Sequence, residues 1–225
     1  MKVVLVLIGS YALGSLPVGL WIARWWAGID VREHGSGNIG ATNVYRVVGR
    51  PAGVVVFVLD VCKGLAPPLA AAGLGLVGLW QVGAGLAAIL GHTVSPFLRF
   101  RGGKGIATSL GVLFGVAWKV GWTAWAMWGV VLAATGYVSA ASIVASVSLA
   151  PLTVLFYPHD TARLVFALLA GGMSLYKHRA NMVRLAAGTE NAVRKQGASR
   201  GIVLATNVVA LAILAAILAY ALARP

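Results

Sequence analysis

The sequence has few acidic residues, few charged residues of any kind and a single cysteine. Asp and Glu together number 5 in 225 residues, and charged residues make up 10% of the chain, against about 25% in a soluble domain. Five scattered acids cannot build a metal site, and Cys62 alone excludes a disulfide framework or a thiolate cage. With 60% hydrophobic residues, the composition is typical of a protein embedded in a lipid bilayer, with no metal and no cofactor expected.

The charge that is present has one sign. Lys and Arg number 18 against the 5 acids, a formal net charge of +13. In a soluble protein this excess would indicate a nucleic-acid partner. In a membrane protein it indicates cytoplasmic loops, because Lys and Arg collect there, so no nucleic-acid partner is expected.

Apolar stretches separated by polar loops predict an all-α, polytopic membrane bundle. A spanning helix needs roughly 20 apolar residues, and the shortest stretch, 106–117, is too short to cross without tilt or local thinning. The eight candidate spans are 3–26, 51–73, 76–97, 106–117, 121–134, 138–157, 162–176 and 202–222.

Cations gather in three loops, at 32–50, 99–105 and 177–200. If all eight stretches cross, these loops lie on one side, which the positive-inside rule makes cytoplasmic. Contact with anionic lipid headgroups is one role for such loops. The many glycines of the first two loops indicate a second role, the binding of an anionic ligand, because glycine lets backbone N–H groups approach an anion closely.

The first loop contains "GSGNIG", which fits the G-x-G-x-x-G spacing of a dinucleotide-binding turn. That motif needs a preceding strand inside a βαβ unit, and here an apolar helix precedes it. The spacing is therefore a coincidence. In the second loop, "GGKG" leads directly into an apolar helix, where a phosphate can sit at a helix N-terminus beside Lys104. Leu98 and Gly105 exclude a Walker A loop.

Several polar residues within the apolar stretches have two interpretations. Asp60 and Lys63, three residues apart, either neutralise each other or contact substrate. A serine stripe that includes Ser142 is typical of helix packing. His92 and His178 flank the basic loops, either as structural residues or in the chemistry. Tryptophans at 118, 122, 125 and 128 indicate an interfacial belt.

Taken together, the loops resemble the bacterial acyl-phosphate-dependent glycerol-3-phosphate acyltransferases. The matching segments occur in the family's order and cover residues 1 to about 196. They are "GSLPVG" at 14–19, "REHGSGNIGATNVYR" at 32–46, "DVCKG" at 60–64, "GH" at 91–92, "FRGGKGIATSLG" at 100–111 and "HRANMVRLAAGTE" at 178–190. Ala180 departs from the glutamate usual in the third motif.

The resemblance implies acyl transfer from a fatty acyl phosphate to the sn-1 hydroxyl of glycerol 3-phosphate, giving lysophosphatidic acid and phosphate without a covalent acyl-enzyme. It also implies a seven-helix core in the bacterial cytoplasmic membrane, a site facing the cytoplasm and functional coupling to the enzyme that makes acyl phosphate. The division expected is an acyltransferase core at 1–200 and an additional transmembrane helix at 201–225. The alternatives are an organic-phosphate transporter, or the same transfer with acyl-CoA as donor.

The residues of these motifs form the expected site. Those expected to act in catalysis are Ser36, Arg46, Lys104, His178 and Asn181. Those expected to bind substrate are Gly37, Asn38, Thr42, Asn43, Lys63, His92, Gly102, Gly103, Gly105, Thr108, Ser142 and Glu190. The proton of the attacking hydroxyl goes either to His178 or to a substrate phosphate.

Overall fold

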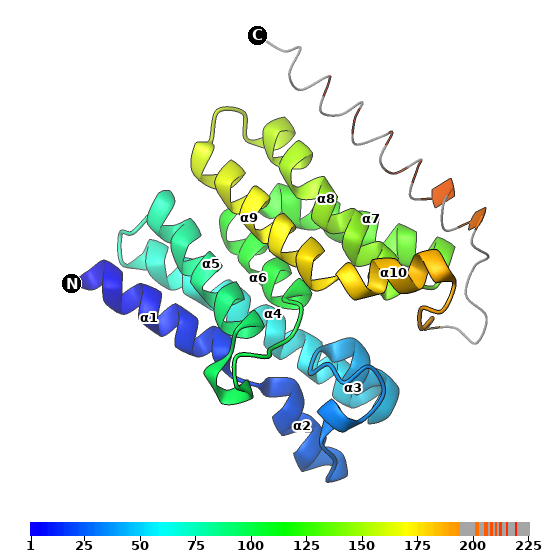
Figure 1. Cartoon of the computed structure of the whole chain (residues 1–225). Helices are drawn as coiled ribbons and strands as arrows, with labels where there is room; N and C mark the ends of the chain where they lie inside the picture. The colour runs from blue at the N-terminus through cyan, green and yellow to red at the C-terminus, as the bar shows by residue number, and fades with distance from the viewer. Residues whose placement is uncertain are drawn as a thin grey trace. The chain divides into compact units, whose positions relative to one another are not determined.

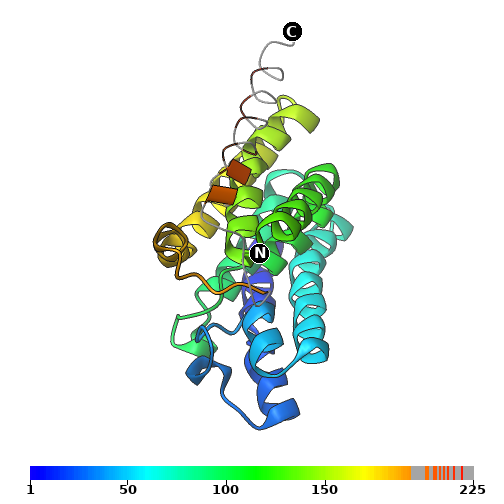
Figure 2. The same cartoon turned by 90° about the vertical axis from the view of Figure 1, so that its right-hand side faces the viewer.

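The structure is a computed structural model that describes residues 1–193 and, beyond them, residues 201, 202, 205, 206, 208, 210, 212, 215 and 219. Within these residues the chain forms helices and no strand, which confirms the all-helical prediction. The predicted C-terminal helix at 202–222 lies largely outside the described residues, so its role stays a prediction. The chain divides into two compact units, Met1–Val116 and Ala117–Pro225 (Figures 1 and 2).

The first unit carries the first two polar loops between its helices. Helix α1 packs against α5, and α4 packs against α3, α5 and α6 (Figure 1). The elements are α1 (Lys2–Ser15), α2 (Val18–Ala27), the 3₁₀ turn η1 (Val31–Glu33), α3 (Ala41–Val47), α4 (Arg50–Gly73), α5 (Leu79–Thr93), the 3₁₀ turn η2 (Pro96–Leu98) and α6 (Ile106–Val116).

The first apolar stretch is broken into α1 and α2, where the sequence predicts one helix over 3–26. Leu16 adopts φ −57° and ψ 121°, the extended conformation favoured by a residue before proline. Pro17 follows and has no N–H to continue the helical ladder. The break leaves carbonyl oxygens at the end of α1 that side chains from other elements satisfy. Ser95 donates its hydroxyl to the Ser15 carbonyl oxygen at 2.6 Å.

Helices α4 and α6 pack closely because glycines line their contact. A Cβ added at Gly64 would lie 2.8 Å from the carbonyl carbon of Thr108, and one at Gly111 would lie 2.8 Å from the backbone nitrogen of Leu65. Both distances are shorter than real Cβ contacts. Small residues that let helix backbones approach are typical of membrane bundles. This seam fixes the start of α6, where the second loop ends.

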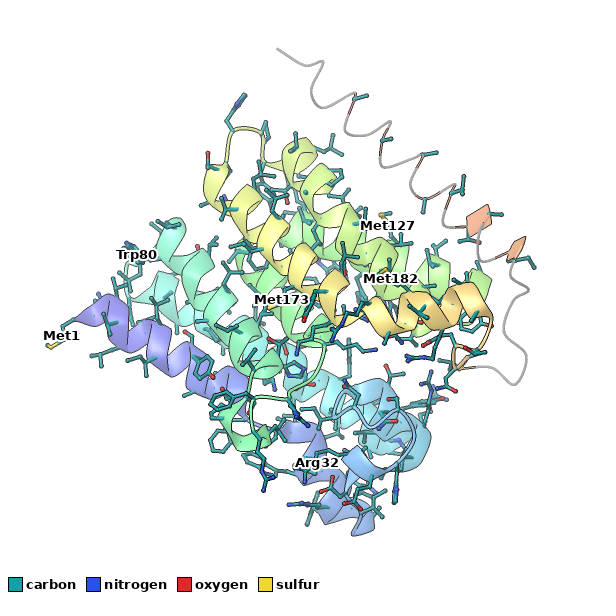
Figure 3. The ribbon with its side chains drawn as sticks, in the orientation of Figure 1. Met1, Arg32, Trp80, Met127, Met173 and Met182 are labelled. Carbon is teal, nitrogen blue, oxygen red and sulfur yellow. The ribbon has the colours of Figure 1, made fainter. Side chains whose placement is uncertain are left out.

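The second unit carries the third polar segment. Its helices are α7 (Trp118–Thr135), α8 (Val138–Phe156), α9 (Thr161–Lys177) and α10 (Arg179–Ala187). Helix α8 packs against α7 and α9, and the short α10 contacts α8 and α9. Met127, Met173 and Met182 mark α7, α9 and α10 in Figure 3. The backbone N–H of Val193 donates to the Gly136 carbonyl oxygen at 2.9 Å, which ties the segment after α10 to the turn between α7 and α8.

Three helical stretches of the described residues are long and apolar enough to cross a membrane: Lys2–Ala27, Arg50–Gly73 and Val138–Phe156. Helix α6 is a shorter apolar helix of 11 residues. Pro51 stands in the first turn of α4, where its missing N–H has no intrahelical partner to lose. The predicted aromatic belt is exposed at Trp118 and Trp122, which are 57% and 53% accessible.

Candidate active site

The first polar loop is held together by the side chain of Asn43, which lies in α3 and is 2% exposed. Its amide N–H groups are shared among the carbonyl oxygens of Val31, His34 and Asn38 at 2.9–3.0 Å. Its amide oxygen accepts the backbone N–H of Ser36 at 2.8 Å. One buried amide therefore fixes the loop on α3, and the substrate contact expected of Asn43 stays a prediction.

Glycines allow the loop to wrap around that amide. Gly35 and Gly37 have φ of +59° and +68°, a conformation that costs glycine little. A Cβ at Gly35 would collide with the amide oxygen of Asn43. Asn38 accepts the N–H of Gly40 at 2.8 Å. Because the loop follows helix α2 rather than a strand, its G-x-G-x-x-G spacing is not that of a dinucleotide-binding turn.

An ion cluster anchors the start of this loop. Asp30 accepts hydrogen bonds from the guanidinium of Arg32, labelled in Figure 3, at 2.6 and 2.9 Å, and from Arg24 at 2.8 Å. The hydrogen bonds from Arg32 hold the pKa of Asp30 well below its usual range, and Asp30 in turn raises the pKa of Arg32. Beyond this anchor, Ser36 is exposed, whereas Thr42 and Arg46 are half-buried on α3.

The second loop is bonded to the end of α5. The N–H groups of Gly102 and Gly103 donate to the carbonyl oxygens of Thr93 and His92 at 3.2 and 3.1 Å. A Cβ at Gly103 would lie 3.0 Å from Cε1 of His92 and nearer still to Nε2, so the loop backbone rests directly on the imidazole ring. These two N–H groups are engaged by α5. The N–H groups of this region that a helix start leaves available to an anion are therefore those of the first turn of α6.

Lys104 and Gly105 lead from the loop into α6. Lys104 is half-buried, and Gly105 has φ of +81°, a turn that glycine makes without strain. Thr108 is fully buried in the first turn of α6, and its Oγ1 has no hydrogen-bond partner within the described residues. Arg99 and Arg101 are exposed beside the loop. The cations and the helix start thus make one electropositive edge.

A buried ion pair lies beneath the second loop. Asp60 and Lys63 are 3% and 5% exposed, and Lys63 Nζ lies 2.9 Å from Asp60 Oδ1. The same carboxylate oxygen lies 3.7 Å from Nδ1 of His92. Lys63 also donates to the carbonyl oxygen of Leu16 at 2.9 Å, at the break between α1 and α2. The predicted Asp60–Lys63 pair is thereby confirmed, and the structure brings Lys63 and His92 together behind Gly103.

In the second unit, a polar cluster surrounds the start and end of α10. His178 is 2% exposed, and its Nδ1 lies 2.8 Å from the Ser174 carbonyl oxygen. Because a carbonyl only accepts, Nδ1 carries the proton, and a neutral ring has its lone pair on Nε2. Glu190 is held from both sides: Asn181 donates to Oε1 and Arg184 Nε donates to Oε2, each at 2.7 Å. His178, Asn181 and Glu190 thus belong to one segment.

The serine stripe of α8 makes specific contacts. Ser142 accepts the indole N–H of Trp128 at 3.1 Å. Ser146 and Ser174 share a hydrogen bond at 2.6 Å between α8 and α9, which confirms a packing role for that part of the stripe. The substrate contact expected of Ser142 stays a prediction.

Two residues of these clusters are absent from the predicted site. Asp60 supports His92, and Arg184 pairs with Glu190. The sequence carried a signal for both, because each lies three residues from a predicted site residue on its own helix: Lys63 in one case and Asn181 in the other. Across the described part of the chain, no three His, Cys, Asp or Glu residues are grouped so as to hold a metal ion.

The family model of glycerol-3-phosphate acyltransferases matches residues 4–188. The chain belongs to the glycerol-3-phosphate acyltransferase family. This family member is 44% identical over 186 residues to the glycerol-3-phosphate acyltransferase of Synechococcus sp. (strain JA-2-3B'a(2-13)), a match that covers 83% of this chain and 92% of that relative. The expected family is confirmed.

Two solved structures resemble this acyltransferase. One is the crystal structure of PlsY (YgiH), an integral membrane glycerol 3-phosphate acyltransferase, in its glycerol 3-phosphate form, with a TM-score of 0.81 and 39% identity over 86% of this chain and 96% of that one. The other is the lysophosphatidic acid form, with a TM-score of 0.78 and 38% identity over 91% and 99%. Together with its apolar helices, this likeness identifies the acyltransferase as an integral membrane protein.

Proposed function

We propose that this acyltransferase uses a fatty acyl phosphate as its donor. The acyl group passes to the sn-1 hydroxyl of glycerol 3-phosphate, and the products are lysophosphatidic acid and inorganic phosphate. The second loop carries the proposal: it sets Lys104 and the first turn of α6 side by side, on a backbone fixed to α5 by Gly102 and Gly103. Such an edge suits a phosphate, and both substrates of this reaction carry one.

The transfer needs no covalent enzyme intermediate. The hydroxyl oxygen of glycerol 3-phosphate attacks the carbonyl carbon of the acyl phosphate, the bond from that carbon to the phosphate oxygen breaks, and the hydroxyl proton leaves with a phosphate. An acyl phosphate is a mixed anhydride with a good leaving group. Positioning the two reactants can account for about 7–11 kcal/mol of the barrier in favourable cases, and donors aimed at the developing oxyanion add to this.

The expected site residues come from the second loop and the start of α6, from the first loop, and from the start of α10. Lys104, Thr108 and the start of α6 bind the phosphate of glycerol 3-phosphate, while Ser36 and Arg46 act from the first loop. His178 and Asn181 act from the start of α10. For Gly37, Asn38, Thr42, Asn43, Ser142 and Glu190 we propose contact with substrate or support of the residues that make it. Asn43 and Glu190 are already hydrogen-bonded within their own segments, which favours support.

A substrate phosphate takes the hydroxyl proton in this proposal. His178 has the tautomer that a base needs, with Nδ1 protonated against the Ser174 carbonyl. However, the partner of Nδ1 is a neutral backbone carbonyl rather than the carboxylate that orients the histidine base of a catalytic triad, which favours the phosphate as base. A His178→Gln enzyme that loses affinity for substrate but keeps kcat supports the phosphate as base. A fall in kcat with intact substrate binding contradicts it, because that result assigns the proton transfer to the ring.

The site faces the cytoplasm of a bacterium in this proposal, because the cationic loops follow the positive-inside rule. Glycerol 3-phosphate then reaches it from the cytoplasm and the acyl chain from the bilayer. We also propose functional coupling to the enzyme that synthesises acyl phosphate, because that enzyme supplies the donor. Acyl-CoA is the competing donor. The loops are short, and their described residues form no element of a size to bind its adenine nucleotide, which favours the acyl phosphate.

The test uses purified protein in detergent with labelled glycerol 3-phosphate. Palmitoyl phosphate and palmitoyl-CoA are offered separately to the wild type, to Lys104→Ala and to Lys119→Ala, the last a matched loss of an exposed lysine at the start of α7. We expect lysophosphatidic acid from palmitoyl phosphate alone, lost in Lys104→Ala and kept in Lys119→Ala. Product from palmitoyl-CoA overturns the donor. No product from either donor overturns the proposal.

A further inference from the structure

The ion pair of Asp60 and Lys63 stands in the middle of α4, a candidate membrane span. A buried ion pair is weak evidence for stability, because two apolar residues of similar volume often serve as well. If the two charges only neutralised each other, their other contacts would be incidental. Each partner instead makes a second contact, and the two contacts lead to different polar loops.

Asp60 leads to the second loop. Its carboxylate lies 3.7 Å from Nδ1 of His92, a side chain that is 4% exposed. The opposite edge of that ring supports the backbone of Gly103, where a Cβ would lie 3.0 Å from Cε1. Lys104 is the next residue. The imidazole is therefore a spacer between the carboxylate and the loop that carries the cation.

Lys63 leads to the first loop. Its ammonium donates to the carbonyl oxygen of Leu16 at 2.9 Å, where the break between α1 and α2 interrupts the helical ladder. Helix α2 starts two residues later and packs closely on the first loop: a Cβ at Gly19 would lie 3.0 Å from the carbonyl carbon of Ile39. The break at the end of α1 sets the position of α2. The position of α2 in turn sets that of the first loop, which carries Ser36.

We infer that Asp60 and Lys63 are positioning residues that set the first loop and the second loop relative to each other. The inference rests on the proposed function, because the relative position of the two loops determines how glycerol 3-phosphate binds between Ser36 and Lys104. In this inference the pair acts through its contacts with the two loops, and the substrate contact expected of Lys63 stays a prediction. The contacts of the pair are the carbonyl oxygen of Leu16 and the ring of His92, both in the first unit.

The decisive variant replaces the pair with apolar residues, Asp60→Leu together with Lys63→Met. It leaves no buried charge unpaired, so we expect wild-type yield and a thermal unfolding temperature within a few degrees of wild type. Both loop contacts are lost. We therefore expect the KM for glycerol 3-phosphate to rise at least tenfold, because a small misplacement of binding groups is costly. Asp60→Asn, which leaves the ammonium of Lys63 without its counter-charge, should raise the same KM and also lower the unfolding temperature.

Val112→Ala is the matched control for a loss of buried volume in the same unit. Val112 is fully buried in the middle of α6 and faces Gly85 of α5. It should lower the unfolding temperature and leave the KM for glycerol 3-phosphate unchanged.

A double variant with the wild-type KM overturns the inference, because Asp60 and Lys63 then neutralise each other without affecting the two loops. A double variant that fails to fold also overturns it, because the pair is then needed for the fold as a whole rather than for the loops. A wild-type protein that makes no lysophosphatidic acid refutes the proposed function instead. The positioning role is then tested by the Kd for glycerol 3-phosphate, measured by calorimetry on the wild type and the double variant, and an equal Kd in the two overturns it.

Discussion

Gly103→Ala tests the seating of the second loop on α5. The added Cβ would lie 3.0 Å from Cε1 and 3.2 Å from Cδ2 of His92, with Nε2 nearer still, whereas ordinary contact begins at 3.4 Å. The ring is 4% exposed and stands between the loop and Asp60, so it cannot swing out into solvent. The loop must move instead.

The expected effect follows from that displacement. A shift on the order of 1 Å in a positioning group can cost about 100-fold in rate, which corresponds to about 2.7 kcal/mol of transition-state stabilisation. We expect kcat/KM for glycerol 3-phosphate to fall by roughly this factor, while the thermal unfolding temperature changes by only a few degrees. The assay is steady-state release of labelled lysophosphatidic acid from palmitoyl phosphate in detergent.

Gly83→Ala is the matched control for this prediction, because it adds the same methyl group to the helix that carries His92. Its Cβ meets only Leu7 Cδ2, at an ordinary 3.5 Å, so activity should be unchanged. A mutant cycle identifies the cause: in a His92→Ala background, Gly103→Ala should cost far less than in the wild type. Wild-type kcat/KM for Gly103→Ala, or equal losses in the two backgrounds, refutes the seating of the loop on the ring.

Three further predictions concern stability. Asn43→Leu removes the side-chain partner of the Val31 and Asn38 carbonyl oxygens and of the Ser36 N–H, so the free energy of unfolding should fall by about 3 kcal/mol or more and acylation should cease; wild-type thermal stability contradicts this. The lowered pKa of Asp30 means that its ion cluster stabilises the loop fully above roughly pH 4 and loses this effect as pH falls through the folded-state pKa. The difference in unfolding temperature between wild type and Asp30→Asn should therefore be constant from pH 8 to about 5 and shrink only in stronger acid, and a difference already lost at pH 5 would contradict the cluster. Gly64→Ala should destabilise the α4–α6 seam by about 1–3 kcal/mol, whereas Gly172→Ala, where nothing lies within 4 Å of the added Cβ, should not, and equal unfolding temperatures for the two would argue against close packing at Gly64.

Local rules account for much of what the sequence predicts correctly. Composition and apolar stretches indicate a helical membrane protein because a bilayer offers no partner to unpaired backbone groups. Pro51 marks the start of α4, and the three-residue spacing of Asp60 and Lys63 places both on one helix face. The family match confirms the identity implied by the glycine and cation motifs.

Local rules failed where the outcome depends on partners distant in the chain. The sequence predicts one helix over 3–26; Pro17 interrupts it, and the carbonyl oxygens left at the end of α1 are satisfied by Ser95 and Lys63. Asn43 looks like any polar loop residue in the sequence, yet a buried site with four backbone partners makes it the centre of the loop. Neither set of partners is visible in a single sequence, because both join residues through packing.

The sequence by itself determined the class of protein, the electropositive loops and the family, because hydrophobicity, charge and motif spacing are properties of the chain alone. Only the tertiary structure decided that the N–H groups of Gly102 and Gly103 bond to α5, that His92 carries the second loop, and that Asp60 and Lys63 reach towards both loops of the first unit. The physical reason is that a hydrogen bond or a close contact depends on where two backbones meet. Helix packing sets where they meet, and the sequence of one segment does not show which other segment it will pack against.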